Sequence, residues 1–165
     1  MPKLAELNAM DRLEFVRVVG PVFEHSPWVV ARSEAQRPFS SREALHAALT
    51  ATVEKASAEE RVCLIRAHPD LIGDGELTAA SKSEQASAGL PDASPEEAIQ
   101  FREFNRQYRE RFGFPFVICA RLNKKAAIAR AFPVRLRNSR EEEIETALEE
   151  IAKIAELRLN DFIAE

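Results

Sequence analysis

Apolar residues recur every three or four positions along most of the chain, which is the spacing of one face of an α-helix. The pattern predicts an amphipathic helix over residues 41–56, with its apolar face formed by Ala44, Leu45, Ala48, Leu49, Val53 and Ala56. A second strong pattern predicts a last helix over about 140–163, with an inward stripe of Ile144, Ala147, Leu148, Ile151, Ile154, Ala155 and Phe162. This spacing indicates a helical protein.

Several helix starts are marked by a serine followed three positions later by glutamate. In this capping box each side chain binds the backbone amide of the other residue. The pairs are Ser40 with Glu43, Ser57 with Glu60, and Ser139 with Glu142. Ser94 and Pro95 predict the start of another helix, which Gly113 closes. Pro69 ends the helix predicted over 58–67, and this places His68 at a junction between helix and loop.

Weaker patterns predict four further helices, near residues 9–19, 28–36, 78–88 and 124–136. Pro133 is expected to break or kink the last of these. Residues 114–120 combine a proline with β-branched residues, which suits an extended segment. We therefore expect an all-α fold, a single compact multi-helix domain of about eight helices with one short extended segment, covering residues 1–165.

Composition and charge narrow the classes of function. The 23 basic residues are interleaved with 27 acidic ones, giving a net charge of −4, so a basic face for nucleic acid is not expected. No apolar run approaches the roughly 20 residues of a membrane span, and the N-terminus has no leader pattern, so we expect a cytoplasmic protein without membrane contact. Cys63 and Cys119 are isolated, which favours two buried, reduced thiols over a metal site.

His68 is the first candidate for chemistry. It lies between the end of a predicted helix and a loop stiffened by Pro69. A histidine in this position often caps the carbonyl groups of the preceding helix. Histidine is also the usual general acid or base near neutral pH, so the sequence leaves both roles open.

The predicted helix over 78–88 is built mainly from small residues and carries one polar cluster. Ser81, Glu84, Gln85 and Ala88 share a face because they are three or four positions apart. Such a face is either solvated or able to approach a ligand closely.

Arg158 lies on the inward stripe of the last helix, where a buried guanidinium needs a partner. Glu84, another acid or a substrate carboxylate could pair with it, or the side chain could extend to solvent. An acid, an imidazole and a guanidinium together suggest a site for a small anionic ligand. The sequence has no phosphate-binding loop, nucleophile elbow or zinc-protease motif.

Four blocks in order along the chain resemble the OHCU decarboxylase family, where OHCU is 2-oxo-4-hydroxy-4-carboxy-5-ureidoimidazoline. They are VFEHSPW at 22–28, HPDL at 68–71, SKSEQ at 81–85 followed by AGL at 88–90, and FNRQYRERFGFPFVI at 104–118. The resemblance implies an all-helical enzyme of urate degradation that decarboxylates OHCU to (S)-allantoin. It also implies a homodimer that uses no metal or organic cofactor.

The same resemblance assigns roles to individual residues. It implies that His68 is the catalytic proton donor, that Glu84 and Arg158 are the other catalytic candidates, and that Pro69 lies in the pocket wall. A substrate-binding helix is matched by Ser81, Lys82, Ser83, Glu84 and Gln85. A segment that offers backbone groups to the ligand is matched by Phe116, Val117, Ile118, Cys119 and Ala120.

Two other functions stay open on the sequence. A helical interaction module would have an exposed apolar groove, with His68 and Arg158 purely structural. A hydrolase acting on a related ureide would need a metal-activated or base-activated water. The scarcity of clustered metal ligands counts against the metal-dependent form of this hydrolase.

Overall fold

The computed structural model describes residues 1–164, which form nine α-helices and four short 3-10 helices. The α-helices are α1 (Leu4–Ala9), α2 (Arg12–Val19), α3 (Pro27–Ser33), α4 (Arg42–Lys55), α5 (Ala58–Arg66), α6 (Ala79–Ser87), α7 (Pro95–Phe112), α8 (Lys125–Arg135) and α9 (Arg140–Phe162). The 3-10 helices are η1 (Gly20–Val22), η2 (Glu34–Gln36), η3 (Leu90–Asp92) and η4 (Ala120–Leu122). Within residues 1–164 there is no β-sheet, only an isolated bridge between Lys3 and Ala164. The predicted all-α fold is confirmed.

Most predicted helix starts carry the expected caps. Reciprocal side-chain to backbone bonds join Ser57 with Glu60, Ser94 with Glu97, and Ser139 with Glu142. Gly113 ends α7 with a φ of 78°, in the left-handed region that glycine adopts readily. The box predicted at Ser40 is wrong by one residue. Ser41 has the extended backbone of an N-cap, and its hydroxyl accepts from the amide of Ala44 at 3.0 Å.

Other predicted boundaries also need correction. The helix expected over 9–19 is α2, which begins only at Arg12 because Asp11 caps it by accepting from the amide of Glu14 at 2.9 Å, and α1 was not predicted. The helix expected over 28–36 is α3 followed by η2. Pro133 does not end α8, which continues to Arg135. No helix in the described residues is long and apolar enough to cross a membrane.

The chain divides into two compact units. We call residues 1–64 together with 152 onward the terminal unit, and residues 65–151 the central unit. Both α5 and α9 contribute residues to each unit. The prediction of one domain over residues 1–165 stays a prediction.

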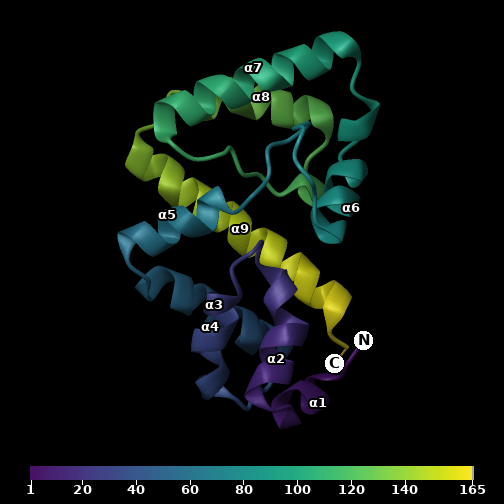
Figure 1. The fold of residues 1–165 in the computed structure, drawn as a ribbon, viewed down its shortest axis with the longest axis vertical. Coiled ribbons are helices and arrows are strands. Elements are labelled where there is room, and N and C mark those ends of the chain that lie inside the picture. Colours follow the sequence, from purple (N-terminus) through teal and green to yellow (C-terminus); the bar gives the residue numbers. More distant parts are fainter. Residues whose placement is uncertain (165) are drawn as a thin grey trace. The chain divides into compact units, whose positions relative to one another are not determined.

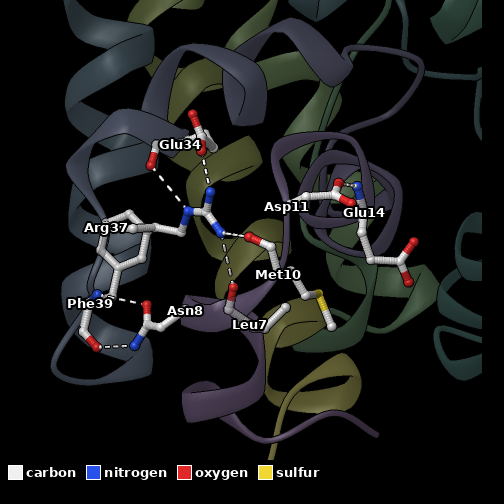
Figure 2. Close-up of polar contacts among 8 residues, drawn as sticks. All are labelled: Leu7, Asn8, Met10, Asp11, Glu14, Glu34, Arg37 and Phe39. Carbon is white, nitrogen blue, oxygen red and sulfur yellow. Dashed lines mark hydrogen bonds and ion pairs between the residues drawn. The ribbon is translucent and has the colours of Figure 1, made fainter.

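In the terminal unit, α3 packs against α2 and α4 around a core that includes Phe15, Val30 and Leu49. Side chains tie the segment after η2 to α1 (Figure 2). Arg37 donates to the carbonyls of Leu7 and Met10 at the C-terminal end of α1, and the Leu7 carbonyl also accepts from the amide of Met10 at 3.3 Å. The Asn8 amide donates to the carbonyl of Phe39 at 2.9 Å and accepts from its amide at 2.8 Å.

In the central unit, α7 and α8 lie side by side (Figure 1), with aromatic rings between them. Phe104 stacks on Phe132, with ring centres 5.0 Å apart, and Phe116 stacks on the same ring at 3.8 Å. Residues 114–120 are all buried, and 115–119 have no regular secondary structure. The predicted extended segment is therefore present, although it forms no strand.

A buried polar cluster holds this segment to three helices. Arg135 donates to Glu143 Oε1 at 2.8 Å and to the carbonyl of Val117 at 2.7 Å. The Tyr108 hydroxyl donates to the same Glu143 oxygen, and Asn138 donates to the other at 2.9 Å. Burial, together with the hydrogen bond to Glu143, raises the pKa of Tyr108. The cluster links α7, α8 and α9 to the backbone of residues 116–120.

Removing the Glu143 charge should destabilise the protein, because Arg135 would be left buried without its counter-ion. We predict that Glu143→Gln lowers the free energy of unfolding by about 3–5 kcal/mol, measured by urea denaturation. Glu141→Gln, an exposed acid two positions earlier in α9, is the control and should change it by less than about 0.5 kcal/mol. Equal free energies of unfolding for the two variants would contradict a stabilising role of the ion pair between Arg135 and Glu143.

Candidate active site

His68 lies two residues beyond the end of α5, at the predicted junction with a loop. Its backbone amide donates to the carbonyl of Ile65 at 3.1 Å, which closes the last turn of the helix. Its side chain is buried, with only 7% of the residue exposed. Pro69 follows and restricts the backbone, so the position of the imidazole depends on the course of residues 68–72.

Helix α6 presents the predicted polar face. Thr78 caps its N-terminus by accepting from the amide of Ser81 at 3.2 Å. Ser81, Gln85 and Ala88 are buried and Glu84 is half-buried, whereas Lys82 and Ser83 are exposed. The common face expected from the sequence is confirmed.

Gln85 joins α6 to the loop that carries His68. Its side-chain nitrogen donates to the carbonyl of Asp70 at 3.2 Å, and its oxygen accepts from the amide of Ile72 at 3.3 Å. From α7, Asn105 donates to the carbonyl of Leu71 at 2.8 Å. Three consecutive residues after Pro69 are therefore bound by side chains of two helices.

The segment 116–120 ends near α6, since α6 contacts η4, which begins at Ala120. The Cys119 amide donates to Glu150 Oε2 at 3.1 Å, and its carbonyl accepts from Asn123 at 3.0 Å. Burial raises the pKa of the Cys119 thiol, and the carboxylates of Glu150 and Glu84 act in the same direction. Glu84 is thus close enough for its charge to act on the segment that contains Cys119.

The central unit therefore holds most of the predicted site. His68 and Pro69, residues 81–85 of α6, and residues 116–120 all belong to it. The roles expected for these residues stay predictions.

Arg158 belongs to the terminal unit. Its guanidinium donates to Glu24 Oε1 at 2.8 Å and to the carbonyl of Pro21 at 3.1 Å, and only 2% of the residue is exposed. The acid expected to accompany it is therefore Glu24, within the VFEHSPW block. The alternative that this side chain extends to solvent is wrong.

Sequence reasoning missed several residues that support the site. Asn105 was detectable, because it is a polar residue on the apolar stripe of α7 between Phe101 and Tyr108. Glu143 was hidden in a run of acids typical of a helix start, where negative charge is expected. Cys63 is exposed, so the expectation of two buried thiols is wrong for that residue. Its place in a short amphipathic helix did not reveal which face it occupied.

A hollow of about 380 Å³ lies beside α6, with Ile72, Leu77, Lys82, Gln85 and Leu90 among its mainly apolar lining residues. Neither His68 nor Glu84 lines it. Among the described residues, no group of three or more His, Cys, Asp or Glu side chains is arranged to hold a metal ion.

The two cysteines should differ in reactivity. Thiolate is the reactive form, so the buried Cys119, with its raised pKa, should react with an aromatic disulfide reagent at pH 8 at least about tenfold more slowly than Cys63. Cys63→Ser and Cys119→Ser assign the two phases, and both thiols should react rapidly in denaturant. Equal rates in the folded protein would contradict the described surroundings of Cys119.

Comparison with known proteins agrees with the motif blocks. The family model for OHCU decarboxylase matches residues 8–160. The 2-oxo-4-hydroxy-4-carboxy-5-ureidoimidazoline decarboxylase of Haloferax volcanii is 46% identical over 94% of this chain and 93% of its own length. The Mus musculus protein of the same name is 40% identical over 97% of this chain and 92% of its own length.

Two crystal structures are similar in fold. One, of (S)-allantoin synthase, has a TM-score of 0.81 and 28% identity, and covers 99% of this chain and 54% of that chain. The other, of OHCU decarboxylase in the presence of (S)-allantoin, has a TM-score of 0.69 and 27% identity, over 83% of this chain and 91% of that chain. With the family model spanning nearly all of the sequence, this chain belongs to the OHCU decarboxylase family.

Proposed function

We propose that this protein decarboxylates OHCU to (S)-allantoin in urate degradation, without a metal or organic cofactor. The observation that carries the proposal is that relatives of 40–46% identity, matched over nearly their full length, bear the name OHCU decarboxylase. The grouping of His68, α6 and residues 116–120 in one compact unit supports it.

The substrate can supply its own electron acceptor. When the bond between the ring carbon and the carboxylate breaks, CO₂ leaves and the electron pair moves into the neighbouring ring imine. A cofactor that stores electrons is therefore not needed. A proton then adds to one face of the ring to give a single enantiomer of allantoin. The protein has to orient the substrate, exclude water and control that proton.

We assign these tasks to residues of the central unit. His68 donates the proton, and its burial limits exchange with bulk water. Glu84, half-buried on α6, orients the reacting group. The apolar segment 116–120 lowers the local polarity, and its backbone groups other than those bound by Arg135, Glu150 and Asn123 bind the ring. The other proposed substrate contacts are Pro69, Ser81, Lys82 and Ser83.

Three further assignments rest on the sequence. Arg158 is proposed as a catalytic arginine, and its ion pair with Glu24 fixes the guanidinium. We infer a homodimer, as the family resemblance implies, and a cytoplasmic location. No nucleic acid or membrane takes part in the proposed activity.

Loss of the imidazole should abolish the enzymatic reaction. We predict that His68→Asn lowers the rate of optically active allantoin formation at least about 100-fold, because His68 donates the proton, and that Glu84→Gln lowers it strongly, because Glu84 orients the reacting group. The assay follows circular dichroism of the product made from urate by urate oxidase and hydroxyisourate hydrolase.

The matched controls are His46→Asn and Glu103→Gln. The His46 ring binds the carbonyl of Ala152 in the terminal unit, and Glu103 is exposed on α7. Both controls should keep the unmodified rate. Optically active allantoin formed by His68→Asn at the unmodified rate would rule out the proton-donor assignment.

A further inference from the structure

The loop after His68 has a backbone that would not persist on its own. Ile72 has a φ of 54°, in the left-handed region that is sterically unfavourable for a β-branched residue. A Cβ added at Gly73 would come within 3.0 Å of the Asp70 Cβ, so the chain turns back sharply on Asp70. Strained backbone of this kind persists only where surrounding groups hold it.

Hydrogen bonds hold this loop to α6. Ile72 and Gln85 both line the 380 Å³ hollow, whereas Leu71, between Asp70 and Ile72, is buried in the core. The Gln85 side chain binds both ends of residues 70–72, the carbonyl of Asp70 and the amide of Ile72. Its amide nitrogen and oxygen are therefore both engaged with the loop.

Asn105 supplies the second attachment. It is 6% exposed and donates to the carbonyl of Leu71, but its own Oδ1 is buried without a hydrogen-bond partner among the described residues. A buried unsatisfied oxygen is costly, and an apolar residue would fit the stripe of α7 at least as well. The hydrogen bond to the Leu71 carbonyl explains why residue 105 is an asparagine. Arg109 adds a more exposed bond, to Asp70 Oδ1 at 2.9 Å.

We propose that Gln85 and Asn105 are positioning residues, which hold residues 70–72 in their strained course and thereby fix the imidazole of His68. This inference rests on the proposed role of His68 as proton donor. It replaces the expected direct contact between Gln85 and the substrate with an action through the loop. A displaced loop would move the imidazole through Pro69, and a shift of about 1 Å in a reacting group can cost 100-fold in rate.

The first test separates positioning from substrate binding. Gln85→Met and Asn105→Leu keep the side-chain size and remove the bonds to the loop. Each should lower kcat about 10- to 100-fold and leave KM within about threefold. Gln107→Met is the control and should leave both constants unchanged, since Gln107 is exposed on α7 and its side chain donates to Glu103, also on α7. A raised KM with unchanged kcat would overturn the proposal, because it would make Gln85 a substrate ligand.

The second test uses the strain itself. Glycine accepts positive φ, so in an Ile72→Gly background the loop needs less support and Gln85→Met should reduce kcat only about threefold. An equal loss in both backgrounds would show that Gln85 acts directly on the reaction, which contradicts the proposal. If Gln85→Met does not fold, Gln85→Glu replaces it, because a carboxylate cannot donate to the carbonyl of Asp70.

The third test does not depend on activity. In protein labelled at histidine, the His68 ring resonances, assigned by their absence in His68→Asn, should shift or broaden in Gln85→Met, while those of His25 and His46 should not. Unchanged His68 resonances would overturn the positioning role. If His68→Asn remains fully active while these resonances shift in Gln85→Met, the proton-donor assignment fails and the structural coupling stands.

Discussion

Buried backbone outside regular secondary structure must have its N–H and C=O groups bonded by something other than itself. Two segments of the central unit meet this constraint at the proposed site. Residues 70–72 are bonded by Gln85 and Asn105, and residues 117–119 by Arg135, Glu150 and Asn123. The walls of the site are thus irregular segments held by side chains from the surrounding helices.

This arrangement gives α6 two functions. Its Gln85 holds the loop of His68, while Glu84, one position earlier, is half-buried and acts electrostatically on Cys119. Neighbouring residues of a helix point about 100° apart, so one short helix can act on residues 70–72 and on residues 117–119.

The helices were largely predictable from the sequence because their signals are local. Capping serines, the closing Gly113 and the apolar spacing of α4, α7 and α9 each depend on residues a few positions apart. The error at Ser40 is also local, since Ser40 and Ser41 are adjacent and either could cap the helix.

Tertiary partners were less predictable. The sequence indicated that Arg158 needed an acid, but Glu24 is 134 positions away and could not be chosen over Glu84 by spacing. The positive φ of Ile72 had no sequence signal, because isoleucine is among the residues least expected there. The motif blocks marked the segments of the proposed site, but they did not reveal which side chains support those segments.

Amide hydrogen exchange at Ile72 tests the central constraint most directly. If side chains of α6 hold the irregular segments, the Ile72 amide is protected in the unmodified protein, and Gln85→Met accelerates its exchange at least about tenfold while the Cys119 amide, bound to Glu150, keeps its rate. Exchange at Ile72 that is already fast, or that Gln85→Met does not change, would contradict this account.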